Sequence, residues 1–203
     1  MENLQLFEYD SALRNDYPLL CGTDEAGRGP LAGDVYAAAV VFDEGVFIDG
    51  INDSKKLSEK KREALYDEIV SKARAYCVAT ASVEEIERLN ILQAALLAMK
   101  RAVEGLGIVP DMAIIDGNKL PDLNCPMRTV VKGDGLSASI AAASILAKVS
   151  RDRYMKTLAE QYPEYGFEKH KGYGTKFHNE MILKYGPSPV HRMSFLKKLL
   201  KNG

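Results

Sequence analysis

Two adjacent carboxylates, Asp24 and Glu25, stand where a short apolar run enters a glycine-rich turn. The run from Leu19 to Cys21 predicts a buried strand, and the stretch from Gly27 to Pro30 predicts where it stops. Neighbouring acids repel each other, and each costs free energy to desolvate unless a cation or hydrogen-bond donors meet it. A bound divalent metal ion is the simplest remedy. The ordinary alternative is a turn that leaves both acids in water.

The turn also carries groups that suit phosphate. Gly27 and Gly29 leave their backbone N–H groups uncovered by side chains, so a nucleic-acid backbone can approach closely. Arg28, between them, is a planar cation that matches phosphate oxygens. Acids for a metal beside donors for phosphate favour phosphodiester chemistry.

Two further acids follow predicted strands. Asp116 ends the apolar run that begins at Met112, and Asp134 precedes a long helix predicted from Ser137. If the strand before Asp116 is parallel to the one before Asp24, both acids lie at one edge of an α/β sheet, where such folds carry their sites. A plain turn at Asp116, and an acid favoured by a helix dipole at Asp134, are the alternatives. Four carboxylates form an all-oxygen ligand set that suits Mg²⁺ or Mn²⁺ and not zinc.

Six segments in order along the chain resemble bacterial ribonuclease HII. They are DEAGRGP at 24–30, DSKKL at 53–57, IIDGN at 114–118, KGDG at 132–135, SIAAASILAKVSRD at 139–152 and HKGYGT at 170–175. The resemblance implies a ribonuclease H-like fold and a metal-dependent endoribonuclease that acts on RNA/DNA hybrids and on single ribonucleotides in duplex DNA. It implies that the catalytic residues and metal ligands are Asp24, Glu25, Asp116 and Asp134. Two ions would serve hydrolysis 5′ to the ribonucleotide, leaving 3′-hydroxyl and 5′-phosphate ends.

The resemblance also implies nucleic-acid contacts. Gly27, Arg28 and Gly29 would read the ribose 2′-hydroxyl, and Tyr173, flanked by glycines, would pack on the adjoining deoxyribose. A plain loop tyrosine is the alternative for Tyr173. By the same resemblance, either Lys55 or Lys56 would contact phosphate, although solvated lysines at a helix entrance are common.

The long helix carries one small and polar stripe. Counted at 100° per residue, Ala141, Ser144, Lys148 and Asp152 lie on the side of Asp134. Ser144 and Lys148 are candidate contacts for backbone phosphates, with an ordinary solvated stripe as the alternative.

The order of predicted elements gives the fold class. Strands are expected at 19–21, 35–42, 74–81, 112–115 and 129–131, with helices at 1–17, after Ser58, after Ser82 with a break at Asn90, and at 137–160. This order predicts a mixed five-stranded α/β sheet flanked by helices. Residues 1–162 would form the catalytic domain, and residues 163–203 a small basic helical appendage, with helices capped by Thr175 and Ser194.

Composition bounds the function. The 203 residues are 46% hydrophobic with a net charge of −1, so bulk charge does not point to a nucleic-acid binder. Residues 161–203, however, carry eight Lys or Arg against three acids. A basic tail behind an acidic body fits phosphate binding, and equally fits a merely solvated basic surface.

Several classes of site and location are disfavoured. The three cysteines are odd in number and far apart, and the three histidines are scattered singly along the chain, so neither disulfides nor zinc is expected. No run of about 18 apolar residues is present, so no membrane contact is expected. We expect a cytoplasmic monomer whose partners are RNA/DNA hybrids and ribonucleotide-containing DNA duplexes. A sliding clamp is a possible partner that no residue indicates.

Three rival functions remain in view. The case for a nucleotide-binding domain is weak, because GRGPLAG does not match GxGxxG and no GxxxxGK[ST] occurs. An inactive nucleic-acid binding module would gain nothing from carboxylates that face phosphates. A ribonuclease that needs a run of ribonucleotides is the third rival.

The geometry of a strand bears on the proposed metal site. Asp24 and Glu25 point to opposite faces of an ideal strand, so they can share metals only if that strand twists or ends.

Overall fold

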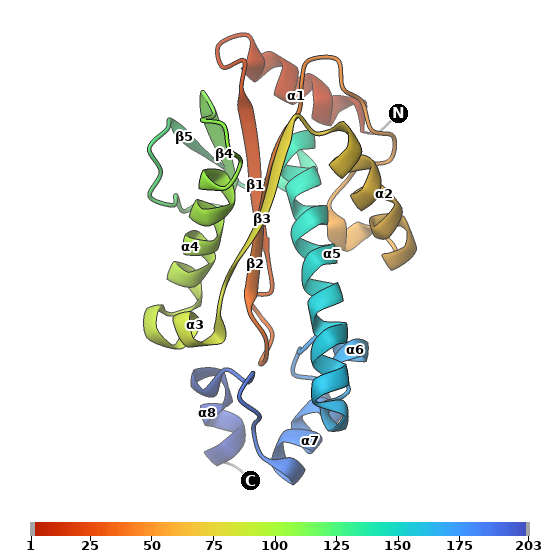
Figure 1. Cartoon of the computed structure of the whole chain (residues 1–203), viewed down its shortest axis with the longest axis vertical. Coiled ribbons are helices and arrows are strands. Elements are labelled where there is room, and N and C mark those ends of the chain that lie inside the picture. The colour runs from red at the N-terminus through yellow and green to blue at the C-terminus, as the bar shows by residue number, and fades with distance from the viewer. Residues whose placement is uncertain (1–2, 202–203) are drawn as a thin grey trace.

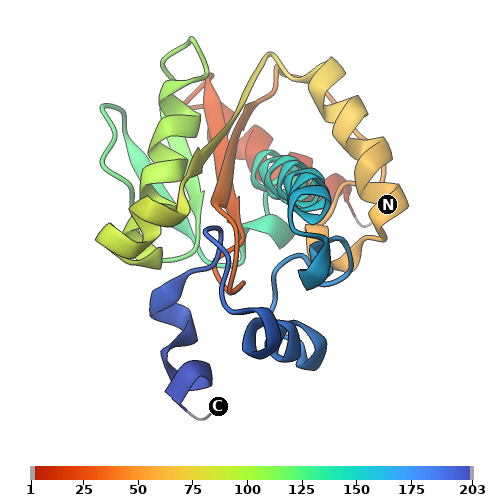
Figure 2. The ribbon, with the colours of Figure 1, turned by 60° about the horizontal axis from the view of Figure 1, so that its bottom comes forward.

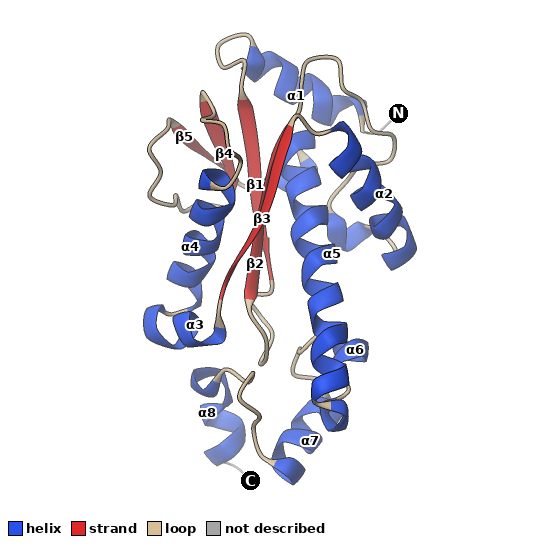
Figure 3. Cartoon of the chain, viewed as in Figure 1, coloured by secondary structure: helices blue, strands red, loops and turns tan. Residues whose placement is uncertain are grey.

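The computed structural model describes residues 3–201, and its centre is one five-stranded sheet (Figures 1 and 3). The strand order is β3-β2-β1-β4-β5, with β1 parallel to β4 and β4 parallel to β5, whereas β1–β2 and β2–β3 are antiparallel. The strands are β1 Leu20–Ala26, β2 Val35–Val41, β3 Ala75–Ala81, β4 Met112–Asp116 and β5 Met127–Val130. The predicted mixed α/β sheet is confirmed, with strand ends shifted by a few residues.

Helices cover both faces of the sheet. On one face lie α1 Leu4–Arg14, α2 Glu59–Lys72 and the long α5 Ala138–Gln161, and on the other lie α3 Val83–Leu89 and α4 Ile91–Glu104 (Figure 1). The small residues of β2 alternate between them. Ala38 packs with α5 and α2, while Ala37 and Ala39 pack with α4. Alternation along an extended strand therefore divides the core into two layers.

Side chains at the predicted positions start most of the helices. Ser58 accepts from the amide of Lys61, Ser82 and Glu85 form a reciprocal capping box, and Asn90 separates α3 from α4. Ser137 and Thr175 cap α5 and the later α7. These caps satisfy amides that a helix start otherwise leaves without partners. The cap at Ser137 fixes where α5 begins.

A glycine lets α5 approach β1 closely. A Cβ on Gly22 would lie 2.3 Å from the carbonyl carbon of Ser139 and 2.4 Å from the amide nitrogen of Ile140. Only a residue without a side chain fits there. The first turn of α5 therefore lies directly against β1, two residues before Asp24.

The C-terminal segment packs on the far end of α5 (Figure 2). It contains α6 Phe167–His170, α7 Lys176–Tyr185 and α8 Met193–Lys201. A separate apolar cluster joins it to the body, through Ala32, Met155, Leu158, Tyr165, Phe167, Ile182 and Leu196. Ser194 was predicted to cap the last helix, but α8 begins one residue earlier, and Ser194 instead donates from its amide and hydroxyl to Glu87. None of the helices within residues 3–201 has the length and apolar character that a membrane crossing needs.

Candidate active site

The parallel pairing of β1 and β4 brings two carboxylates to one edge of the sheet. Thr23 pairs with Ile115 at the end of the shared ladder, so Asp24 and Asp116 are the next residues on the two strands. Asp116 itself pairs with Val130 of β5. The expected parallel arrangement of these strands is confirmed, and it places both acids at the carboxyl ends of the central strands.

Asp24 and Glu25 point to opposite faces of the sheet. Strand β1 continues through both residues, and Asp24 pairs with Ala38 whereas Glu25 pairs with Ala37. Because Ala38 packs toward α5 and Ala37 toward α4, the two carboxylates face different layers. The strand does not end before them, so they can share a ligand only around the strand edge, beyond the tip of β4.

A short turn brings Asp134 to the same edge. The carboxylate of Asp116 accepts a hydrogen bond of 2.6 Å from the amide of Gly133, which begins the 3₁₀ turn Gly133–Gly135. Asp134 follows directly, and Lys55 Nζ lies 3.8 Å from its Oδ2. Asp116 therefore fixes the loop that carries the next acid of the site.

Burial and mutual repulsion act on these acids together. Desolvation raises the pKa of Asp24 well above its usual range, and the charges of Glu25 and Asp116 raise it further, against a 2.7 Å hydrogen bond from the Glu25 amide. Burial also raises the pKa of Glu25, where Arg28 at 3.3 Å opposes it. The pKa of Asp134 is raised first by burial and then by Asp53 and Asp116. Negative charge is thus crowded at a site that is largely closed to water.

This crowding fits a divalent cation in its chemistry. All the donors are carboxylate oxygens, which hard cations such as Mg²⁺ and Mn²⁺ prefer, and a cation would reverse the repulsion. In residues 3–201, however, no three Asp, Glu, His or Cys side chains converge closely enough to hold an ion as they stand. Binding would therefore require the carboxylates to turn toward one another from the shared edge.

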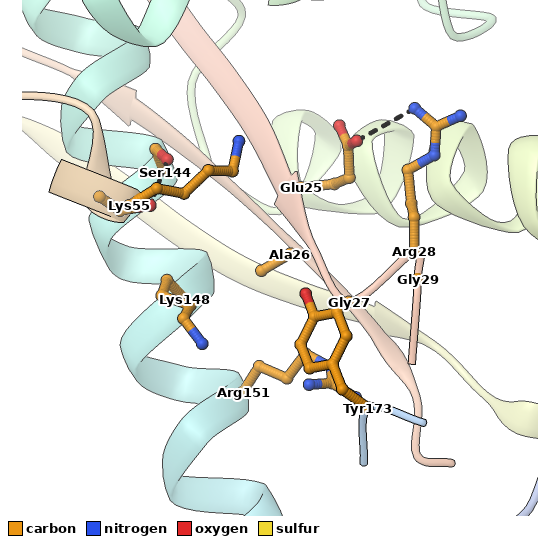
Figure 4. Close-up of a pocket in the computed structure, with 11 residues that line it drawn as sticks. Glu25, Ala26, Gly27, Arg28, Gly29, Lys55, Ser144, Lys148, Arg151 and Tyr173 are labelled. Atoms are coloured by element: carbon orange, nitrogen blue, oxygen red, sulfur yellow. Dashed lines mark hydrogen bonds and ion pairs between the residues drawn. The ribbon is translucent and has the colours of Figure 1, made fainter. Parts of the chain in front are cut away.

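A pocket opens beside the acids, between β1, α5 and the C-terminal segment (Figure 4). Its lining consists of Glu25, Ala26, Gly27, Arg28, Gly29, Ser54, Lys55, Ser144, Lys148, Arg151 and Tyr173. It contains seven of the eight residues that were expected to contact nucleic acid. The exception is Lys56, which is exposed outside the pocket. Of the two candidate lysines, Lys55 is therefore the one at the site.

The polar stripe of α5 is not a solvated face. Ser144 is buried, and its hydroxyl shares a 2.9 Å hydrogen bond with that of Ser54. Lys148 donates to the buried Asp152 at 2.6 Å, and Arg62 lies 3.8 Å from the same carboxylate. Arg62 also donates to the carbonyls of Ser54 and Leu57. The stripe therefore ties the 54–57 turn, with Lys55, to the helix.

Tyr173 stands over the glycine turn. A Cβ on Gly29 would lie 3.3 Å from the ring edge of Tyr173, and this side chain is 47% exposed (Figure 4). Gly172 has a φ of +82°, and a Cβ there would lie 2.7 Å from the carbonyl oxygen of Ala32. A left-handed glycine therefore lets the loop close on the turn and leaves one side of the Tyr173 ring free.

Sequence reasoning missed two buried arginines. Arg151 donates to the carbonyls of Ala32, Asp34 and Lys171, and Arg192 donates to carbonyls of the 27–33 turn. An arginine inside an apolar helix is a signal of a buried polar role. The partners of the two arginines were not predictable, because main-chain carbonyls, most of them more than 100 residues away, leave no motif in the sequence.

The three histidines stand singly in the sequence but lie close together in space. The rings of His170 and His178 stack at 4.4 Å, and Nε2 of His178 lies 3.0 Å from Nε2 of His191. The last two are buried, and desolvation lowers the pKa of each to about 4. They form part of the C-terminal core beside Tyr165 and Phe167 and lie away from the carboxylates.

Comparisons with known proteins identify the family of this chain. The family model "Ribonuclease HII" matches residues 21–198. A ribonuclease HII of Caldicellulosiruptor saccharolyticus is 54% identical over 192 residues, which are 95% of this chain and 94% of the relative.

Solved structures of related enzymes have the same fold. The ribonuclease H2 of Pyrococcus horikoshii has a TM-score of 0.74 at 26% identity, covering 90% of this chain and 97% of the other. The ribonuclease HII in a PCNA complex from Archaeoglobus fulgidus has a TM-score of 0.73 at 26% identity, and the match covers 89% of this chain and 96% of the other. Bst-RNase HIII in complex with Mn²⁺ has a TM-score of 0.74 at 20% identity, and the match covers 91% of this chain and 70% of the other. At this identity the likeness supports the fold alone. The chain belongs to the ribonuclease HII family and is a ribonuclease H-type endonuclease.

Proposed function

We propose that this enzyme hydrolyses the RNA strand of RNA/DNA hybrids and cuts duplex DNA on the 5′ side of a single embedded ribonucleotide, as a step in ribonucleotide removal and DNA repair. The observation that carries the proposal is the position of Asp24, Asp116 and Asp134 at one sheet edge. This edge lies directly beside a pocket lined by groups that suit phosphate and sugar. The products would carry 3′-hydroxyl and 5′-phosphate ends.

The four carboxylates have the chemistry of a two-metal site. Asp24, Glu25, Asp116 and Asp134 would hold two Mg²⁺ or Mn²⁺ ions, whose chemistry is to activate water and to stabilise the leaving oxygen. The Gly133 amide holds Asp116, and the Glu25 amide holds Asp24, so each of these two carboxylates has one oxygen fixed in orientation. Burial of Asp24 keeps bulk water from competing there.

The pocket suits the junction between a ribonucleotide and DNA. The backbone of Gly27, Arg28 and Gly29 would meet the 2′-hydroxyl, and Tyr173 would pack on the neighbouring deoxyribose. Lys55 and Lys148 would contact phosphates beside the cut. Ser144 would act indirectly, because its hydroxyl holds Ser54. Lys56, outside the pocket, would contact a more distant phosphate.

We treat residues 1–162 as the catalytic domain and residues 163–203 as a basic segment that completes the substrate face. Support comes from Tyr173, which belongs to the segment and lines the pocket, and from the apolar cluster that seats the segment on α5. The enzyme would work as a cytoplasmic monomer. The archaeal relative was solved in a complex with PCNA, which makes a sliding clamp a candidate partner of this enzyme.

A panel of substrates tests this proposal. The wild-type protein is incubated with Mg²⁺ or Mn²⁺, or with a chelator, on a duplex with one ribonucleotide, on a long RNA/DNA hybrid and on all-DNA duplex. Metal-dependent cutting of the first two and not the third is expected. Cutting of the hybrid alone would favour the enzyme that needs a run of ribonucleotides, and tight binding without any cutting would favour the inactive binding module.

A further inference from the structure

A buried arginine from the C-terminal segment binds the back of the glycine turn. Arg192 is 0% exposed, and its guanidinium makes five hydrogen bonds, all to main-chain carbonyls. The acceptors are Gly27 at 2.7 Å, Arg28 at 3.2 Å, Pro30 at 2.9 Å and Gly33 at 2.6 and 2.9 Å. The arginine thus holds most of the turn from about 160 residues away in sequence.

These bonds do not use the charge in an ion pair. The guanidinium meets carbonyl dipoles, and burial together with Arg151 lowers the pKa of Arg192 to about 9. Burying a cation against neutral partners costs free energy that an apolar side chain would not. Because all five hydrogen bonds of this cation go to the 27–33 turn, the side chain fixes the shape of the turn.

The carbonyl directions determine where the turn's amides point. Each peptide unit is planar and trans, so its N–H points opposite to its C=O. Because the carbonyls of Gly27 and Arg28 face Arg192, the amides of Arg28 and Gly29 face away from it. Both residues line the pocket beside Tyr173 (Figure 4).

The Pro30–Leu31 peptide unit of the turn shows the same opposition. The carbonyl of Pro30 accepts from Arg192, while the following amide, that of Leu31, donates to Gly172 beside Tyr173. The side of the turn opposite Arg192 is therefore the side that the Tyr173 loop approaches.

We propose that Arg192 is a positioning residue for substrate recognition, which turns the amides of Arg28 and Gly29 toward an oxygen of the nucleic acid. The inference rests on the proposed function and extends it to a residue outside the pocket. The oxygen is either the ribose 2′-hydroxyl or a phosphate oxygen. Arg192 does not touch it.

Two variants test the role. Arg192→Lys keeps one charge but cannot reach four carbonyls, and Arg192→Ala with added guanidinium ion refills the space. Arg88→Lys, at an exposed arginine of α3 outside both the pocket and the basic segment, is the matched control. Thermal unfolding first establishes that each variant is folded. The ¹H–¹⁵N resonances of Arg28 and Gly29 are then compared without substrate, and duplex affinities are measured with Ca²⁺ to limit cutting.

We expect the two amide resonances to move in Arg192→Lys and to return toward wild type in Arg192→Ala when guanidinium is added. The affinity for the ribonucleotide duplex should fall about tenfold, the effect of losing one or two hydrogen bonds. If the all-DNA affinity is unchanged, the oxygen is the 2′-hydroxyl, and if it falls equally, the oxygen belongs to a phosphate.

Unmoved amide resonances, or affinities within twofold of wild type in a folded variant, would overturn the role of Arg192. A different result is that the two amide resonances move in the Arg192 variants while the wild type neither cuts a ribonucleotide duplex nor binds it in preference to DNA. That result would support the positioning role of Arg192 and overturn the proposed function.

Discussion

Asp24 and Asp116 occupy equivalent positions on two neighbouring parallel strands, one residue beyond the last paired residues, Thr23 and Ile115. The ladder between the strands therefore sets the separation of the two carboxylates before any ligand binds. Asp24 is 4% exposed and repels Asp116, so the folded protein holds these charges in an unfavourable state.

Asp24→Asn should stabilise the metal-free protein. Burial and like charge raise the folded pKa of Asp24 above its unfolded value, so ionisation at pH 7 favours unfolding, and a neutral amide removes that penalty. Each 1 kcal/mol relieved should raise the melting temperature by about 2–4 °C in a chain of this size. Thermal unfolding in a chelator measures it. A lower melting temperature for the variant would contradict the unfavourable burial and repulsion of the Asp24 charge.

Metal ions should stabilise the wild type and not the carboxylate variants. Binding to the folded state at 100 times the dissociation constant adds about 2.7 kcal/mol. We expect Mg²⁺ or Mn²⁺ to raise the melting temperature of wild type but to have little effect on Asp24→Asn or Asp134→Asn. Glu44→Gln, an exposed acid elsewhere, is the control and should respond as wild type does. Equal shifts in all four proteins would place the metal elsewhere.

Gly27→Ala should damage the turn. Gly27 has a φ of +99°, and a Cβ there would lie 2.1 Å from Nε of the buried Arg151. Gly45→Ala shares the left-handed backbone, with a φ of +79° and nothing within 4 Å, so it isolates the backbone cost of about 1 kcal/mol. Urea unfolding should show a loss for Gly27→Ala at least about 1–3 kcal/mol larger than for the control, as overpacking gives. Similar losses would contradict the contact with Arg151.

Tyr173→Ala should weaken binding of the ribonucleotide duplex, and Tyr173→Phe should retain most of it. Stacking on an aromatic ring contributes about 1–3 kcal/mol, so the alanine variant should lose about tenfold or more in affinity. Because the side chain is 47% exposed, neither change should alter the melting temperature much. Fluorescence anisotropy with Ca²⁺ gives both affinities. An unaffected alanine variant would remove Tyr173 from the interface.

Much of the framework was predictable because it depends on local sequence. The capping box of Ser82 and Glu85, the break at Asn90 and the cap at Ser137 involve residues within three positions of one another. The alternation of apolar strands with helical stripes gave the sheet, and acids at the ends of two strands predicted the shared edge. Such signals survive in a single sequence.

What was missed depends on packing across the chain. The opposite directions of Asp24 and Glu25 were expected, but the layer that each one faces depends on which helix covers which side of the sheet. The burial of Ser144 follows from its contact with Ser54, 90 residues away. Likewise, His178 and His191 meet only because α7 and the loop before α8 fold together. Distances of this kind carry no local pattern.

The histidine pair predicts a pH effect on stability. The amide of Ser188 donates to Nδ1 of His191, and Nδ1 of His178 contacts the carbonyl of Tyr173, so a single proton fits between the two Nε2 atoms. The folded pKa of each is lowered to about 4, below the unfolded value near 6.5. The unfolded state therefore binds more protons between these values, and the pair's contribution to stability is lost as the pH falls through that window.

The comparison is the free energy of unfolding at pH 5 and pH 7 for wild type and for His178→Gln. Buried acids such as Asp24 act in the opposite sense, so only the difference between the two proteins reports on the pair. As the pH falls, the free energy of unfolding of wild type should drop by up to about 1.4 kcal/mol per pH unit, for each proton taken up, more than that of the variant. Parallel pH profiles would contradict neutral, hydrogen-bonded imidazoles.

The most direct test of the catalytic site is cleavage of a duplex with one embedded ribonucleotide by wild type and by Asp24→Asn, with the cut position and end groups mapped. Wild type should cut 5′ to the ribonucleotide and leave a 3′-hydroxyl and a 5′-phosphate. The variant should lose more than about a hundredfold in rate, since losing even an outer partner of a metal site costs 10- to 100-fold. A folded Asp24→Asn variant that cuts at the wild-type rate would contradict the assignment of this sheet edge as the active site.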